Sequence, residues 1–421
     1  MLKTFLIVLS FPLSAWSQIY NIKKININGL TKTKKEVVLR ELTFTEKQSV
    51  STQGIQESLE NLNRLNIFHT IKSKIINEGD SSVLTLDLKE KWTTIPFLKL
   101  SSGGGVSQTT FGVYDPNILG HYLELGGQFE KLEEANSGVV WFKNPRLFGK
   151  RMGVNIQAWS FSRIRLKYDQ SLEDPLLING FLHKRQMYYF DLFKEFKKDF
   201  LLRLDVEYNK DEFSTDFLDD DVLSLVTVKG LPQDTEVVFT GVGLTWGRVL
   251  SDQERFHGYG LDLGFRYGSV KSTGIDDFSE SSIRFQYFLP IQNRWNFAQR
   301  VHAGSTSTDV LQYWNYLGGL ESIRGFSDNR FAGRYYWLSN TEMRFTLFRK
   351  PNYIFQLNSF YDVVAAHERF KDLDTSSGSS IGLGGRLILP KVYRFVVRMD
   401  YAVPLKKNDD INLSFGVQQF F

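Results

Sequence analysis

From about residue 93 to the end of the chain, apolar and polar residues alternate almost one by one, in segments of mostly about ten residues. The stretches "LLRLDVEYN" (201–209), "YGLDLGFRYG" (259–268) and "SIRFQYFLPI" (282–291) show the pattern. Successive side chains of a strand point to opposite faces, so each segment has one apolar face and one face rich in Arg, Asp or Glu. The two faces therefore meet different solvents.

The length of these segments favours strands that cross a membrane at a tilt over the shorter strands of a soluble sandwich. Inside lipid every backbone N–H and C=O group needs a partner, so such strands must close into a barrel with a water-filled lumen. We expect sixteen antiparallel strands, an even number as in bacterial single-chain barrels. They cover residues 94–103, 107–114, 119–130, 136–144, 150–162, 185–198, 199–209, 233–248, 257–269, 279–291, 295–306, 334–348, 353–365, 379–390, 391–403 and 411–421. The last strand is predicted to place Phe421 on the same apolar face as Leu413 and Phe415.

The preceding 75 or so residues have a mixed texture that predicts a small α/β domain. "YNIKKININGL" (20–30) reads as a strand that ends in a turn, and "TKTKKEVVLREL" (31–42) as a helix. Ser51 opens a second helical pattern, which places Ile55 and Leu62 on one face. Two alternating stretches, 67–79 and 81–92, complete an order of strand, helix, helix, strand, strand.

The chain begins with "MLKTFLIVLSFPLSAWSQ", in which a lysine precedes an apolar stretch and small residues. This order is typical of a secretory signal peptide cleaved after Ser17; the alternative is a buried N-terminal helix. No later run approaches the roughly 20 apolar residues of a spanning helix. The predicted boundaries are therefore 1–17 for the signal peptide, 18–92 for the α/β domain and 93–421 for the barrel.

Composition excludes several classes of function. The 51 basic and 47 acidic residues are balanced and scattered, which argues against a nucleic-acid partner. There is no cysteine, and the six histidines show no ligand spacing, so we expect neither a metal site nor a cofactor. No nucleophile motif and no phosphate-binding glycine loop occur, so we expect no enzymatic activity and no catalytic residues.

Two stretches of the small domain resemble the POTRA domain. "ININGLTKTKKEVVLREL" (25–42) is similar to its first strand, turn and helix, and "ESLENLNRLNIFHTIKSKI" (57–75) to its second helix and following strand. The resemblance implies a domain that adds extended partner segments to a sheet edge. An unrelated α/β spacer without a partner is the alternative.

Five further stretches resemble, in order, motifs of the BamA/TamA superfamily of outer-membrane assembly and translocation proteins. They are "FGVYDPNILGHYLELGGQ" (111–128), "VVWFKNPRLFGKRMGVNI" (139–156), "GGLESIRGFSDNR" (318–330), "LSNTEMRF" (338–345) and "NSFYDVVAA" (358–366). The resemblance implies a barrel in the outer membrane of a Gram-negative-type cell, in contact with its lipid, and a POTRA domain in the periplasm.

The loop motif consists of Ile323, Arg324, Gly325 and Phe326. Strand parity turns Glu342, Phe360 and Asp362 toward the lumen, so two carboxylates from neighbouring strands make a negative site there. A loop that folds inward would set Arg324 against both carboxylates, an arrangement that the family resemblance also implies. Phe326 would then pack against the inner wall, near Phe360. In the alternative, Arg324 is solvated and Glu342 pairs with its strand neighbours.

The ends of the barrel strands suggest a weak seam. Gly103, Gly104 and Gly105 close the first strand and weaken it, although they would equally serve as a hairpin turn; Phe421 ends the last strand. Members of the family are thought to pair client strands at such a seam.

The function implied is that of an outer-membrane assembly or insertion factor for unfolded β-barrel clients. The alternatives are a pore that passes one secreted polypeptide or solutes, and an anchor that only displays the small domain. The single POTRA domain departs from the several domains usual in central assembly factors, which favours a specialised or accessory member. Periplasmic partners are expected at the POTRA domain.

Overall fold

The computed structural model describes residues 18–103, 106–132, 135–149, 151–169, 176–197, 199–252, 254–327, 329–392, 395–405, 412–417 and 421. The predicted signal peptide, residues 1–17, and the seam residues Gly104 and Gly105 lie outside the described residues. The chain divides into two compact units between Glu90 and Lys91.

The first unit is a four-stranded sheet with two helices. Its elements are β1 (Ile19–Asn28), α1 (Lys35–Leu39), β2 (Gln48–Ser51), α2 (Thr52–Arg64), β3 (Phe68–Glu78) and β4 (Ser81–Glu90). The sheet order is β2-β1-β4-β3, with β1 parallel to β4 and the other pairs antiparallel. The pattern missed β2, because its four residues run directly into the cap of α2 and are too short to show alternation.

Helix α2 begins where the sequence predicts. The Ser51 side chain accepts a hydrogen bond from the backbone N–H of Gly54, which satisfies one of the unpaired donors of the first turn. Ile55, Leu62 and Leu65 are buried against the sheet together with Ile22 and Leu84. The apolar face of the helix therefore forms the core of this unit.

Glu90, the last residue of β4, holds the loop that precedes α1. Its carboxylate accepts hydrogen bonds from the backbone N–H groups of Thr31, Lys32 and Thr33 at 3.1, 2.9 and 2.7 Å, and from the Thr31 hydroxyl. Partial burial alone would raise the pKa of Glu90, but the bonds from the Thr31 and Thr33 side chains and the Lys32 and Thr33 backbone outweigh it and lower the pKa to about 2.

We expect acid to loosen this loop. Because the folded pKa of Glu90 lies below its ordinary value of 4.5, its stabilising effect is complete above pH 4.5 and is lost as the pH falls toward about 2. Hydrogen-exchange mass spectrometry of the full chain, corrected for intrinsic rates, should show protection of residues 31–33 falling over this range. Glu90→Gln should lower that protection already at neutral pH, whereas Glu57→Gln, on the helix α2, should not. Equal protection in Glu90→Gln and the natural chain would contradict the assignment.

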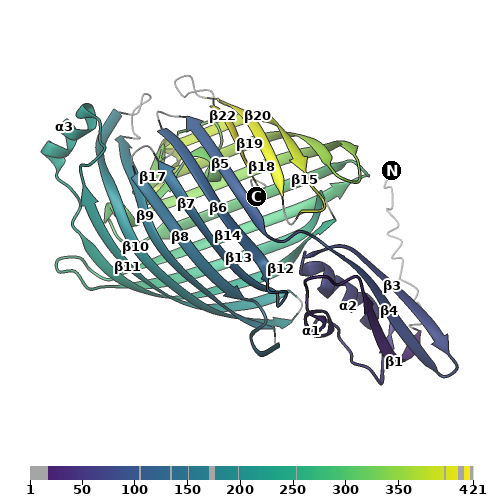
Figure 1. Ribbon diagram of the computed structural model, residues 1–421. Coiled ribbons are helices and arrows are strands. Elements are labelled where there is room, and N and C mark those ends of the chain that lie inside the picture. The colour runs from purple at the N-terminus through teal and green to yellow at the C-terminus, as the bar shows by residue number, and fades with distance from the viewer. Residues whose placement is uncertain are drawn as a thin grey trace, which may run out of the picture. The chain divides into compact units, whose positions relative to one another are not determined.

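The second unit is a barrel of sixteen antiparallel strands, so the fold class predicted from alternation is confirmed (Figure 1). The strands are β5 (Ile95–Gly103), β6 (Val106–Ile118), β7 (Leu123–Leu132), β8 (Ala135–Asn144), β9 (Met152–Asp169), β10 (Leu176–Lys197), β11 (Phe200–Ser214), β12 (Thr235–Asp252), β13 (Arg255–Val270), β14 (Phe278–Ile291), β15 (Trp295–Thr306), β18 (Tyr335–Arg349), β19 (Ile354–His367), β20 (Ser377–Ile388), β21 (Val396–Pro404) and β22 (Asn412–Val417).

Shorter elements lie between the barrel strands. They are η1 (Leu147–Gly149), α3 (Asp220–Lys229), η2 (Leu311–Tyr313), β16 (Asn315–Leu317), α4 (Gly319–Ser322), β17 (Phe331–Gly333) and η3 (Phe370–Thr375). Among the described residues, no helix has the length and apolar content needed to cross a membrane.

The outer and inner faces of the barrel differ as the alternation predicts. On β13 and β14, Leu263, Phe265 and Ile283 point outward and are 40–50% exposed. On β18 and β20 the inward Glu342, Arg344 and Arg386 are fully buried. Apolar side chains thus face lipid, while charged ones gather inside, where they pair with one another.

The chain from Ser307 to Arg334, called the inner loop here, joins β15 to β18 and folds back into the barrel (Figure 1). It contains η2, α4 and the two-stranded ribbon of β16 and β17. Its apolar residues form a buried cluster with inward side chains of β18 and β19. The members are Leu317, Ile323, Phe326, Phe331, Tyr336, Leu338, Val364 and Ala366.

The first and last strands lie side by side but do not complete the ladder. In the part of the chain that the structure describes, β5 hydrogen-bonds to β6 and β22 to β21, and no pairing joins β5 to β22. The blue β5 and the yellow β22 are neighbours in Figure 1. Just before β5, the N–H of Trp92 donates to the carbonyl of Lys391 at 3.1 Å, in the turn between β20 and β21.

Candidate functional site

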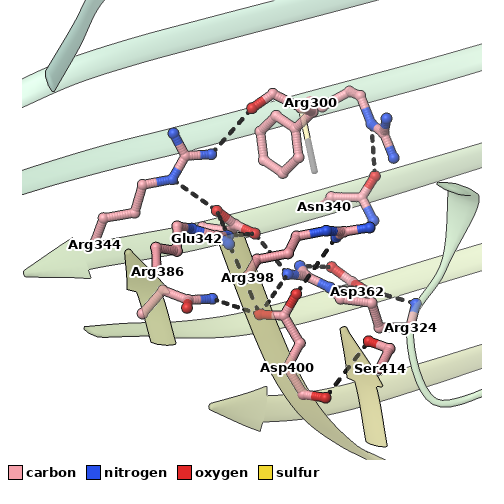
Figure 2. Close-up of polar contacts among 12 residues, drawn as sticks. Arg300, Arg324, Asn340, Glu342, Arg344, Asp362, Arg386, Arg398, Asp400 and Ser414 are labelled. Carbon is pink, nitrogen blue, oxygen red and sulfur yellow. Dashed lines mark hydrogen bonds and ion pairs between the residues drawn. The ribbon is translucent and has the colours of Figure 1, made fainter. Parts of the chain in front are cut away.

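Arg324 lies at the centre of a buried group of charges inside the barrel (Figure 2). Its Nε and Nη2 atoms donate to the two carboxylate oxygens of Asp362 on β19, at 2.8 and 2.9 Å. Its Nη1 atom donates to Oε1 of Glu342 on β18 at 2.6 Å. The guanidinium therefore makes a two-pronged contact with one inward carboxylate and a single contact with the other, a geometry that lysine cannot reproduce.

The backbone of the motif is held as well as its side chain. The N–H of Arg324 donates to Asp362 at 3.2 Å, and the hydroxyl of Ser380 on β20 donates to the Arg324 carbonyl at 2.6 Å. Gly325 has a φ of 90°, a conformation that residues with a Cβ rarely adopt. A Cβ there would also lie 3.2 Å from Ser380 and 3.3 Å from Ala402. Glycine thus permits both the turn and the close approach to the wall.

The two phenylalanines have different neighbours from those expected. The Phe360 ring lies under Arg324, with the guanidinium carbon 3.5 Å from the ring centre, which is a cation–π contact. Phe326 instead packs against Phe331 of β17, with ring centres 5.1 Å apart and the planes nearly perpendicular. Phe326 thus packs against the inner wall, in the cluster that contains Val364 of β19, while Arg324 and not Phe326 lies on the Phe360 ring. Ile323, also in the motif, is fully buried.

Four further charged residues belong to this group and were not singled out from the sequence. Arg344 donates to Glu342 at 2.7 Å, and Arg386 donates to both oxygens of Glu342 at 2.8 Å. Arg398 lies 3.4 Å from Asp400, which is 3.8 Å from Arg324 and 3.9 Å from Arg386. Strand parity alone would have turned Arg386, Arg398 and Asp400 inward, but only the tertiary structure shows which charges meet.

Phe421 does not continue the outward face of the last strand, which corrects the sequence expectation. The Phe421 ring lies 5.1 Å from the guanidinium of Arg300 and 5.4 Å from that of Arg344. Its carbonyl accepts a hydrogen bond from Arg344 at 3.2 Å. Both arginines face the lumen, so Phe421 does too. The attraction of two cations for one aromatic face gives a physical reason for this placement.

A second anchor holds the inner loop on the opposite side of the barrel. Asp211 of β11 is fully buried and accepts hydrogen bonds from the Tyr313 hydroxyl at 2.6 Å and from Arg185 at 2.5 and 3.1 Å. His183 Nε2 lies 2.6 Å from the same carboxylate, and the Thr235 hydroxyl donates to it at 3.2 Å. Tyr313 belongs to the loop and the other four residues to barrel strands or their ends. The sequence held no motif that marked this site.

A third contact ties the far part of the loop to β9. Asn329 accepts a hydrogen bond from Arg165 at 2.8 Å and donates to the carbonyl of Ile164 at 3.2 Å. The loop therefore spans the lumen from the wall of β18–β21 to the wall of β9–β11. Strand β5 begins near Lys91 and successive strands run in opposite directions. The inner loop, which follows β15, therefore lies at the end of the barrel away from Lys91.

The remaining seam residue, Gly103, closes β5 and lies opposite Val106 in the β5–β6 hairpin. Among the described residues, no three His, Asp or Glu side chains gather as ligands of a metal ion. The charged side chains around Arg324 are bound to one another, so this group can hold the inner loop against the barrel wall.

A family model described as the Omp85 superfamily domain matches residues 117–421, which is most of the chain and nearly all of the barrel. The chain belongs to the Omp85 superfamily. A POTRA model, described as a surface antigen variable number repeat, matches residues 20–91. The family resemblance and the POTRA domain predicted from the sequence are thereby confirmed, and this Omp85 protein is an outer-membrane β-barrel protein.

Two curated relatives are similar in sequence. Outer membrane protein assembly factor BamA of Nitratidesulfovibrio vulgaris is 23% identical over 438 aligned residues, which cover 95% of this chain and 51% of that protein. The protein of the same name from Neorickettsia risticii is 28% identical over 135 residues, 31% of this chain and 18% of that protein. The chain thus spans about half the length of the first relative and aligns with less of the second.

Solved structures share the fold. BamA from Haemophilus ducreyi lacking POTRA domains 1–3 has a TM-score of 0.55 at 14% identity, covering 94% of this chain and 84% of that chain. CdiB from Escherichia coli has a TM-score of 0.66 at 14% identity, covering 94% and 76%. At these identities the likeness shows the fold alone.

Proposed function

We propose that this Omp85 protein is an assembly or insertion factor for other outer-membrane β-barrel proteins. The observation that carries the proposal is the seam, where β5 and β22 lie side by side without a ladder among their described residues. The relatives named as assembly factors support the same reading. The proposal places the client at the seam and the POTRA domain in the periplasm.

The seam suits this role because a strand edge with free N–H and C=O groups is a template for another strand. The wall is a continuous hydrogen-bonded sheet from β5 to β22, and among the described residues these two strands alone pair with a single neighbour each. At any other place around the wall, an added strand would have to displace an existing ladder with its hydrogen bonds and cross-strand contacts. A client strand can therefore add to β5 at a smaller cost than anywhere else around the wall.

The POTRA domain offers edges of the same kind. In its sheet the outer strands are β2 and β3, and β3 runs for eleven residues. An extended segment of a client or of a periplasmic partner would bind there chiefly through backbone hydrogen bonds, which tolerate many sequences. We propose that this edge receives unfolded chains before they reach the seam.

A disulfide across the seam should stop insertion. Each variant replaces Leu98 or Leu100 of β5 and Leu413 or Phe415 of β22 with cysteine, and all four side chains are on the outward face. The natural chain has no cysteine, so the two introduced thiols can pair only with each other. In liposomes, the oxidised variants should insert an unfolded barrel client no faster than empty liposomes do, and reduction should restore the natural rate. Ion conductance should stay unchanged, because the lumen is not altered.

The matched control places the disulfide between Leu263 and Ile283, which lie directly opposite each other on the already paired β13 and β14. This bond should leave insertion intact. Undiminished insertion by a fully oxidised seam variant would count against the proposal. If the protein then also passed an unfolded polypeptide or solutes, it would be a translocation pore.

A further inference from the structure

The inner wall of the barrel carries a cavity that is separate from the anchors of the inner loop. It has a volume of about 390 Å³ and lies over β10 to β15. Side chains of Arg203, Arg266 and Arg284 line it together with Asp205, Asp262 and His302. Neither Arg324 nor Tyr313, which hold the inner loop, contributes to it.

Glycine keeps the floor of this cavity open. Gly243 of β12 and Gly264 of β13 lie directly opposite each other and face the lumen. A Cβ at Gly243 would meet nothing closer than the Arg203 Cβ at 3.5 Å, which is ordinary van der Waals contact. Packing therefore does not demand glycine there. Glycine inside a strand weakens it, and often marks a place where a ligand approaches the backbone.

The charged side chains around the cavity differ in how many partners they have. Arg266 has three carboxylate neighbours, Asp205 at 3.4 Å, Glu207 at 2.6 Å and Glu280 at 3.8 Å. Asp262 accepts a hydrogen bond from the Thr245 hydroxyl at 2.6 Å.

Arg203 and Arg284 differ from these groups. Within the described part of the chain their side chains form no hydrogen bond or close ion pair, although the Asp205 carboxylate attracts Arg203 electrostatically. Arg284 lies opposite Asp262 on one neighbouring strand and opposite His302 on the other, yet it bonds to neither side chain. The cavity therefore has two guanidinium groups available.

We propose that this cavity binds a small oxyanion, a phosphate or carboxylate group held between Arg203 and Arg284. The planar guanidinium matches the oxygen pairs of such groups, and two arginines on opposite sides of one cavity would grip a ligand with several oxygens. The hydroxyls of Tyr189 and Ser282, which also line the cavity, supply neutral donors. The site depends on the barrel alone and not on the proposed assembly function.

Calorimetric titration of the full chain in detergent micelles with inorganic pyrophosphate tests the site, with citrate as the carboxylate counterpart. We expect saturable binding of at least one of the two. Arg203→Gln and Arg284→Gln should each weaken it by about tenfold or more, as expected for a lost hydrogen bond to a charged group. Pyrophosphate binding alone identifies a phosphate site, and citrate binding alone a carboxylate site.

Two further variants separate the site from general effects of charge and folding. Gly243→Leu should fill the floor and abolish binding, while the thermal unfolding of the barrel stays the same or rises, because a side chain there favours the strand. Arg294→Gln removes one exposed positive charge outside the cavity and should bind as the natural chain does. The proposal is overturned by an absence of saturable binding, by natural affinity in both cavity arginine variants, or by an equal loss in Arg294→Gln.

Discussion

Replacing Arg324 with alanine is expected to lower the free energy of unfolding of the barrel by about 3–5 kcal/mol, the usual cost of removing one partner from a buried charge group. The change leaves Asp362 without its two-pronged partner and Glu342 without one of its three arginines. It also uncovers one face of Phe360. Unfolding in urea from detergent micelles, and the heat needed to shift the barrel on a gel, measure the loss.

The lysine variant distinguishes the geometry of the contact from its charge. Arg324→Lys keeps one positive charge but offers a single compact donor group, so it should recover only part of the lost stability. Arg369→Ala is the matched control, because Arg369 is 65% exposed and its ion pair with Asp372 is at the surface, where such pairs are worth little. If Arg324→Ala unfolds at the same urea concentration as Arg369→Ala, Arg324 does not hold the barrel.

Replacing Asp211 with alanine is expected to have the second largest effect, again about 3–5 kcal/mol, because Arg185 would lose its carboxylate partner inside the barrel. Tyr313 would lose its acceptor at the same time, which frees the first part of the inner loop. Hydrogen exchange should therefore accelerate in residues 308–317, while residues 322–327 around Arg324 keep their protection.

Tyr313→Phe is the control for this second anchor. It removes only the hydroxyl and keeps the ring, whose centre lies 4.7 Å from that of Phe278 and 5.8 Å from that of Phe239. The loss should be about 1 kcal/mol, the net value of one hydrogen bond. If Asp211→Ala released residues 322–327 as strongly as residues 308–317, the loop would have one cooperative attachment and not two separate anchors.

The two anchors bind the same loop, so their effects should not simply add. Removing one anchor already releases part of the loop, so removing the second then costs less stability. The double variant Arg324→Ala/Asp211→Ala should therefore lose less free energy of unfolding than the sum of the two single losses. A strictly additive loss would mean that each anchor stabilises only its own stretch of wall.

Alternation located the strands well because it follows from the two solvents that each barrel strand meets. All sixteen predicted segments overlap the strands of the barrel. The largest errors are at β9 and β10, which run to Asp169 and begin at Leu176, well beyond the predicted 150–162 and 185–198. Outside the lipid both faces of a ladder are wet, so the hydrogen bonds continue after the apolar face has ended.

By itself, the sequence determined the faces of the strands. Parity turned Glu342, Phe360 and Asp362 inward, and the structure brings Arg324 against all three. That success has a simple physical cause, because a side chain's direction in a strand depends on its own position and on no distant residue.

What only the tertiary structure decided is which distant groups meet. Arg386 and Asp400 join Arg324 from later strands, Asp211 finds Tyr313 across the lumen, and Phe421 turns inward to Arg300. Each of these contacts depends on how the barrel closes and how the inner loop crosses it. Arg300 and Phe421 lie 121 positions apart along the chain, and Arg165 and Asn329 lie 164 apart; no local pattern of hydrophobic and polar residues records such a distance.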